Sequence, residues 1–152
     1  MLSQSGIHAI RAMVTLAGVP ESEYRGVPDI ARATGSPRNY LGKLLLQLSR
    51  HGLVESRKGL GGGFRLAQSP TVISLYDIMA AIEDVGRWTA CGFSGGTCSE
   101  IHPCIVHGRW SGVRDAFLGF LRDTTIAELA SRQRQSETLL TVAPDSRGAI
   151  GS

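Results

Sequence analysis

The residues Gly35-Ser36-Pro37 separate two short amphipathic helix patterns, and this break constrains the fold more than any other feature of the sequence. Glycine ends helices readily, and serine followed by proline is a favourable helix start, because serine caps free N–H groups and proline lacks one. We therefore predict a helix from Pro28 to Thr34 and a second helix with Ser36 as its N-cap and Pro37 as its first residue.

The second of these helices has an apolar and a polar face. Leucines recur at helical spacing on the apolar face, at Leu41, Leu44, Leu45 and Leu48. The polar face carries Arg38, Asn39 and Lys43, and His51-Gly52 ends the helix. A short helix, a tight turn and a second amphipathic helix are the spacing of a helix-turn-helix.

Two short strand patterns follow, at residues 53–57 and 63–67, around a glycine-rich loop. They predict a β-hairpin, which directly after a helix-turn-helix is the wing of a winged helix. The loop lacks the Lys-Ser/Thr pair of a P-loop and precedes a strand, which argues against a nucleotide site. Its basic surroundings suit phosphate contact or minor-groove entry, and the alternative is a flexible turn without a partner.

Three further helices are predicted from apolar spacing and capping patterns. The first spans residues 3–18, with an apolar face formed by Ile7, Ile10, Val14 and Ala17. Capping-box patterns begin two others, at Ser74 with Asp77 and at Thr125 with Glu128. The last helix is expected to be short, with a frayed tail over residues 131–152.

A long helix is predicted from Pro103 to about Thr124. Apolar residues form a heptad seam along it: Val106, Trp110, Val113, Phe117 and Phe120. Such a seam suits a dimer interface, and the alternative is packing against the chain's own core.

Charge is distributed unevenly along the 152 residues. Residues 1–70 carry nine Lys and Arg against four Asp and Glu, whereas residues 71–152 carry seven against nine. A basic first half suits a nucleic-acid-facing module, although solvated surface charge would look the same. There is no run of roughly 18 apolar residues and no signal-peptide pattern, so we expect a cytoplasmic protein and no membrane partner.

The strongest chemical signal is a cysteine-containing segment without helical or strand periodicity, at residues 86–102, and the helix start that follows. Cys91, Cys98, Cys104 and His107 offer three thiolates and an imidazole, and His102 competes for the fourth position. On the predicted helix, Cys104 and His107 lie one turn apart. Zinc knuckles usually space ligands two to four residues apart, so these gaps favour a larger cluster over zinc or free thiols.

The chain resembles the Rrf-two family of bacterial winged-helix transcriptional regulators over roughly residues 1–131. The segments that carry the resemblance are Ala9–Met13, Tyr40-Leu41, Gly52–Val54, Gly59–Phe64 and Thr125–Leu129. The resemblance implies a homodimer joined through the long helix, bound to a palindromic site in double-stranded DNA. It also implies an iron–sulfur cluster as the cofactor in the cluster-sensing members.

In some members, three cysteines and a histidine that follows the third cysteine after two intervening residues hold a [2Fe-2S] cluster. Cys91, Cys98, Cys104 and His107 match this pattern, although six residues separate the first two cysteines where the family commonly has five. Other members hold a [4Fe-4S] cluster with an acidic residue of the partner's first helix. The matching residue here is Ile7, which cannot ligate, and His8 is only its neighbour. We therefore favour [2Fe-2S] over [4Fe-4S] or zinc.

The expected fold is mostly α with a small β-hairpin wing, a winged helix-turn-helix plus a long dimerisation helix. We expect a DNA-binding domain at 1–85, a cluster loop at 86–106, dimerisation and last helices at 103–130, and a flexible tail at 131–152. The predicted DNA contacts are Ser36, Arg38, Asn39, Tyr40, Lys43, Arg57, Lys58, Gly59 and Arg65.

The predicted function is a transcriptional regulator that senses iron–sulfur, redox or nitric oxide status through its cluster. A thiol- or zinc-based regulator of the same fold is the alternative. A small electron-transfer protein is a weaker one, because it leaves the basic half unexplained. The sequence shows no nucleophile–base pair or carboxylate pair, so we do not expect an enzyme.

Overall fold

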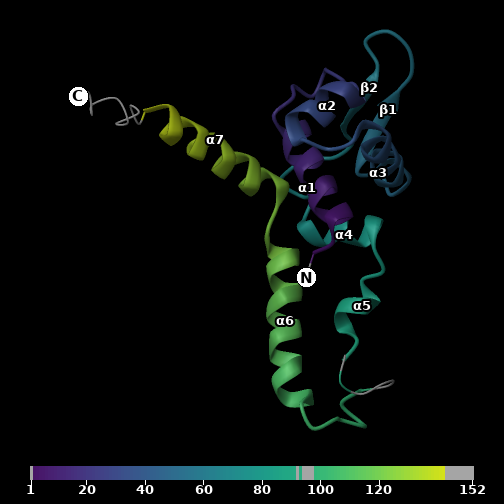
Figure 1. Ribbon diagram of the computed structural model, residues 1–152, viewed down its shortest axis with the longest axis vertical. Coiled ribbons are helices and arrows are strands. Elements are labelled where there is room, and N and C mark those ends of the chain that lie inside the picture. The colour runs from purple at the N-terminus through teal and green to yellow at the C-terminus, as the bar shows by residue number, and fades with distance from the viewer. Residues whose placement is uncertain (1, 92, 94–97, 143–152) are drawn as a thin grey trace, which may run out of the picture.

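In the computed structural model, which describes residues 2–91, 93 and 98–142, the chain forms helices and one hairpin (Figure 1). The elements are α1 (Gln4–Ala17), α2 (Val27–Thr34), α3 (Arg38–Arg50), β1 (Val54–Arg57), β2 (Gly63–Leu66), α4 (Leu75–Ile82), α5 (Gly86–Thr89), α6 (His107–Asp123) and α7 (Ile126–Val142). The strands pair antiparallel, so the predicted fold class of a winged helix-turn-helix followed by a long helix is confirmed. None of the helices described is long and apolar enough to span a bilayer.

Helix α1 lies at the centre and contacts α2, α3, α4, α7 and β2. Its most buried residues are Ala9, Ala12 and Met13, whereas the predicted apolar face of Ile7, Ile10, Val14 and Ala17 is only partly buried. Ile10, Val14 and Ala17 of this face do pack against the core, but α1 is enclosed on several sides and its most buried residues lie elsewhere. Small alanines lie where neighbouring helices approach closely. The larger residues Ile10 and Val14 line a gap beside Gln133 of α7.

The helix-turn-helix is confirmed, but its turn is built differently from the prediction. Gly35 ends α2 in a left-handed conformation, with φ of 67°. Helix α3 begins at Arg38 with Pro37 at the N-cap, and no side chain caps it. The Ser36 side chain is instead buried against Thr34 and His8, so the predicted N-cap role is wrong. The leucine face of α3 is buried as expected.

The loop before α2 pairs with the wing and adds a third short stretch of chain to the hairpin. Arg25 and Phe64 exchange two backbone hydrogen bonds of 2.8 Å, and this pairing extends the hairpin. A Cβ atom at Gly63 would lie 2.2 Å from the Arg25 carbonyl oxygen, and φ there is 134°. Glycine is therefore required at this position both for space and for conformation.

The capping box at Ser74 is confirmed, with Asp77 completing it. The N–H of Glu128 donates to Thr125 Oγ1 at 3.2 Å, as the second capping pattern predicted. However, α7 is not short: it continues to Val142, so residues 131–142 are helical rather than a frayed tail. After residue 130 the sequence contains no glycine or proline, the residues that most often end a helix, until Pro144. The rest of the predicted tail, 143–152, lies outside the described residues.

The segment that joins the body to α6 also departs from the prediction. Residues 86–89 form the short helix α5, in a segment predicted to be irregular. Helix α6 begins at His107, not at Pro103, and the N–H of His107 bonds to the Cys104 carbonyl in a turn. The β-branched pair Ile105-Val106 slightly disfavours helix, and the N-cap residue Val106 makes no side-chain capping bond. Cys104 therefore precedes the helix rather than sharing its first turn.

Candidate metal centre and nucleic-acid interface

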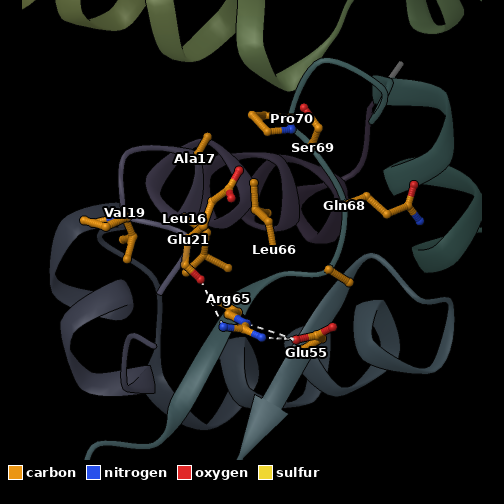
Figure 2. A pocket seen from close by; sticks show the side chains of 12 residues that line it. Leu16, Ala17, Val19, Glu21, Glu55, Arg65, Leu66, Gln68, Ser69 and Pro70 are labelled. Atoms are coloured by element: carbon orange, nitrogen blue, oxygen red, sulfur yellow. Dashed lines mark hydrogen bonds and ion pairs between the residues drawn. The ribbon is translucent and has the colours of Figure 1, made fainter. Parts of the chain in front are cut away.

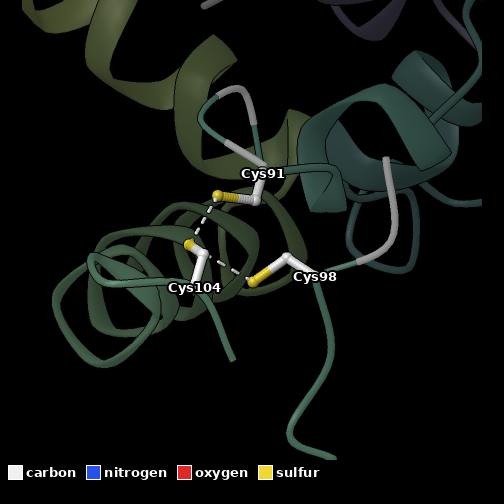
Figure 3. A group of neighbouring side chains, drawn as sticks. All are labelled: Cys91, Cys98 and Cys104. Carbon is white, nitrogen blue, oxygen red and sulfur yellow. Dashed lines mark hydrogen bonds between the residues drawn. The ribbon is translucent and has the colours of Figure 1, made fainter. Parts of the chain in front are cut away.

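The three cysteine sulfurs converge between the end of α5 and the start of α6 (Figure 3). The Sγ atom of Cys104 lies 3.5 Å from the Sγ atoms of both Cys91 and Cys98. All three sulfurs lie within 4.8 Å of one another. Cys91 is 8% exposed, while Cys98 and Cys104 are half-buried. Residues thirteen positions apart are thus brought into one group of potential metal ligands.

His107 joins this group from the first turn of α6. Its Nδ1 atom lies 3.0 Å from Cys98 Sγ. The competing residue, His102, is exposed, and its backbone N–H donates to Ser99 Oγ in a tight turn. The structure therefore brings the three cysteines together and places His107 in contact with Cys98, whereas His102 is exposed.

The donor set fits a thiophilic metal. Thiolates and an imidazole are ligands of zinc and of iron–sulfur clusters, and among the described residues the group contains no carboxylate. Four ligands around one tetrahedral ion with metal–sulfur bonds of about 2.3 Å place sulfurs about 3.8 Å apart. The observed separations of 3.5 Å are close to that value. A two-iron cluster requires wider spacing between sulfurs on different irons.

A cation lies on the same side of α6 as the cysteines. Arg114 hydrogen-bonds to Asp115 at 2.9 Å, which raises the pKa of Arg114, and the charges of Asp115, Glu100 and Cys98 act in the same direction.

The polar face of α3 presents the predicted major-groove residues to solvent. Arg38, Asn39 and Lys43 are exposed. Tyr40 is 37% exposed, and its hydroxyl hydrogen-bonds to Ser5 while its ring packs edge-on against His8. Arg57, Lys58 and Gly59 are exposed in the wing. In contrast, Ser36 is 7% exposed, which removes its side chain from the predicted DNA contacts.

Arg65 is turned toward the protein rather than toward solvent, at the edge of a cavity of about 460 Å³ under the wing (Figure 2). Its guanidinium pairs with Glu55 at 2.9 Å and donates to the Glu21 carbonyl oxygen at 3.0 Å. It also lies 4.6 Å from the centroid of the Tyr24 ring. Arg65 therefore joins the wing to the loop before α2, and its contact with DNA stays a prediction.

The heptad seam of α6 is divided between two environments. Phe117 packs edge-on against Trp88 of α5, with ring centroids 6.0 Å apart, and Val106 and Trp110 are half-buried. Val113 and Phe120 remain 62% and 52% exposed. The deepest residues of α6 are Leu118 and Leu121, which the seam did not include.

Two supporting residues were missed by sequence reasoning. His8 of α1 contacts both Ser36 and Tyr40, and Tyr24 lies beneath the guanidinium groups of Arg57 and Arg65. Each contact joins residues about thirty or more positions apart, and no local pattern indicates such a pair.

Comparison with known proteins agrees with this architecture. The Rrf2 family model, described as "Iron-dependent Transcriptional regulator", matches residues 2–132. The HTH-type transcriptional regulator IscR of Escherichia coli is 31% identical over 132 residues, which is 87% of this chain and 81% of that protein.

Solved structures show the same fold. CymR, the global cysteine regulator of B. subtilis, superposes with a TM-score of 0.72 at 27% identity, over 87% of this chain and 97% of CymR. IscR of T. potens superposes with a TM-score of 0.68 at 24% identity, over 99% of this chain and 93% of IscR. The chain therefore belongs to the Rrf2 (Rrf-two) family and is a transcriptional regulator, not an enzyme.

Proposed function

We propose that this protein is a cytoplasmic homodimeric regulator that binds a palindromic DNA site and responds to a [2Fe-2S] cluster held by Cys91, Cys98, Cys104 and His107. The observation that carries the proposal is the convergence of the three cysteine sulfurs at the N-terminal end of α6, with His107 Nδ1 3.0 Å from Cys98 Sγ. When bound, such a cluster supplies a centre that changes redox state or is lost under oxidative or nitrosative stress.

The kinship with IscR supports a cluster rather than another metal centre. A [4Fe-4S] alternative that needs a ligand from α1 lacks one at Ile7, whose side chain has no donor atom. The nearby His8 is already engaged with Ser36 at 2.6 Å. His107 is therefore the fourth ligand that the described residues offer most directly.

A single zinc ion, or redox chemistry of the thiols themselves, is the second candidate. It is favoured by the short sulfur–sulfur separations, which suit ligands on one ion. An electron-transfer role leaves α3 and the wing without a purpose, and we do not propose it.

For DNA binding, we propose that the first turns of α3 enter the major groove. Arg38 and Asn39 carry the side chains that read guanine and adenine by paired hydrogen bonds, with Tyr40 and Lys43 beside them. The exposed wing residues Arg57, Lys58 and Gly59 approach the phosphates and minor groove. The contact between Tyr40 and His8 holds α3 against α1 and thereby orients this surface.

We propose that the dimer forms through α6. Val113 and Phe120 are large apolar side chains that remain 62% and 52% exposed in one chain, on a helix that projects from the body (Figure 1). Leu118 and Leu121 anchor the same helix to the winged-helix core. A change at the cysteine site therefore acts on the element that sets the distance between the two α3 helices. Such coupling is typically worth about 1–3 kcal/mol.

The test is anaerobic purification followed by iron, sulfide and zinc analysis, an absorption spectrum and selection of DNA sites from a random pool. We expect iron and acid-labile sulfide in equal amounts, a coloured protein and a palindromic selected site that apo and holo forms bind differently. Stoichiometric zinc without sulfide would establish the second candidate. Equal binding of both forms to every site would reduce the metal to a structural role.

A further inference from the structure

The indole N–H of Trp110 is buried without a hydrogen-bond partner among the described residues. Its Nε1 atom exposes less than 1 Å². Indole nitrogen is only a donor, and leaving a buried donor unpaired is energetically unfavourable. The missing acceptor for this N–H therefore points to a bound group outside the described residues.

The neighbours of Trp110 on α6 show which way this side chain faces. His107, three residues earlier, contacts Cys98, and Phe117, seven residues later, contacts Trp88 of α5. Residues at these spacings share one face of a helix. On this face of α6, Trp110 therefore lies between His107, a predicted ligand, and Phe117, which packs against Trp88.

The one unpaired buried acceptor among the described side chains is not near this position. Glu83 Oε1 is at the end of α4, where a Cβ atom on Gly6 would lie 3.4 Å from it. Leu121 is the residue of α6 that lies in the hydrophobic core with α1 and α4. It is about 16 Å along the helix axis from Trp110, at 1.5 Å per residue. The two unpaired groups are therefore not each other's missing partner.

We propose that Trp110 is a positioning residue of the cysteine site, and that its indole N–H donates a hydrogen bond to a sulfur of the bound iron–sulfur cluster. This inference rests on the proposed function. Donation to sulfur stabilises the more negative, reduced cluster and so raises the reduction potential. The same contact explains why a tryptophan in this half-buried face keeps its N–H away from water.

The first experiment compares wild type with Trp110→Phe, which keeps an aromatic ring and removes the donor. Both proteins are purified anaerobically, assayed for iron and sulfide, and titrated for the midpoint potential of the cluster. We expect full iron and sulfide content in both and a more negative potential for Trp110→Phe. Trp88→Phe is the matched control, because it makes the same chemical change in α5, and its potential should equal that of wild type.

A second variant guards against a packing defect in Trp110→Phe. The chain has two tryptophans, so in a Trp88→Phe background Trp110 is the one that remains. Growth of a tryptophan auxotroph on β-(3-benzothienyl)alanine then places sulfur where Trp110 has its N–H, with nearly unchanged shape. We expect the same negative shift in potential from this replacement.

The outcomes separate the two proposals. Wild-type protein without iron and sulfide would overturn the proposed cluster itself. Cluster-loaded Trp110→Phe and benzothienyl proteins with the wild-type potential would overturn the role of Trp110 alone. A shift of equal size in the Trp88→Phe control would also overturn it, because the effect would then come from aromatic packing.

Discussion

Ser36 Oγ in the turn of the helix-turn-helix lies 2.6 Å from Nδ1 of His8 in α1. The same hydroxyl accepts a hydrogen bond of 2.8 Å from Thr34 Oγ1. The residue that local pattern assigned to helix capping is thus a buried link between the turn and the central helix. Since His8 also touches Tyr40, this link orients the polar face of α3.

Ser36→Ala should lower the free energy of unfolding by about 1–3 kcal/mol, because it leaves polar partners unpaired in a buried site. Urea unfolding of the apo protein measures the change. Ser22→Ala, at an exposed position, is the matched control and should stay within about 0.5 kcal/mol of wild type. Equal stability of the two variants would show that the Ser36 contact contributes nothing.

Gly63→Ala should destabilise the protein more than a typical surface change. The new Cβ would meet the Arg25 carbonyl oxygen, and a positive φ is costly for alanine, together more than about 1–3 kcal/mol. Gly42→Ala, a position on α3 where a Cβ meets nothing within 4 Å, should instead stabilise by about 0.5–1 kcal/mol. Thermal unfolding of both variants checks the contrast.

Arg38→Ala should weaken binding to the selected DNA site by about 1–3 kcal/mol and relax one base position, with little effect on random DNA. Lys58→Ala should weaken binding to all sequences alike and reduce the slope of log K against log salt by about 1. Arg132→Ala provides the control, because this exposed arginine pairs with Glu128 on α7. Competition binding at several salt concentrations distinguishes the three. Unchanged affinity in both Arg38→Ala and Lys58→Ala would contradict the proposed DNA surface.

Cys104→Ala should abolish cluster binding, because its thiol contacts both other sulfurs of the group. His107→Ala should weaken retention or change the spectrum, since one ligand is lost while three thiolates remain. His102→Ala is the matched control and should keep wild-type iron and sulfide, because that side chain is exposed whereas His107 contacts Cys98. Loss of the cluster in His102→Ala with retention in His107→Ala would reverse the assignment of the fourth ligand.

Val113→Asp should convert the proposed dimer to a monomer. A carboxylate at this exposed apolar position of α6 would have to be buried without a partner in the interface. Sedimentation equilibrium measures the mass, and Leu46→Asp on α3, also exposed and apolar in wild type, should leave the mass unchanged. A monomeric wild type, or a dimeric Val113→Asp protein, would place the interface elsewhere.

Much of this protein is determined by interactions between residues close in sequence. The leucine spacing of α3 and the capping box at Ser74 relate residues about one helical turn apart, and the hairpin pairs two strands joined by one short loop. Their patterns can therefore be recognised directly. The four candidate metal ligands were also recognisable, because their chemistry is unusual and they lie within seventeen residues of one another.

Tertiary structure decided which way several side chains face. Ser36 turned inward because α1 supplied His8, and the Arg65 guanidinium is held against the loop before α2 by Glu55, Glu21 and Tyr24. Helix α1 buried its small residues because neighbours cover it on several sides. In each case the partners lie far apart in sequence, and only the packed chain brings them within hydrogen-bonding or van der Waals distance. Local spacing cannot encode a contact whose other half lies elsewhere in the chain.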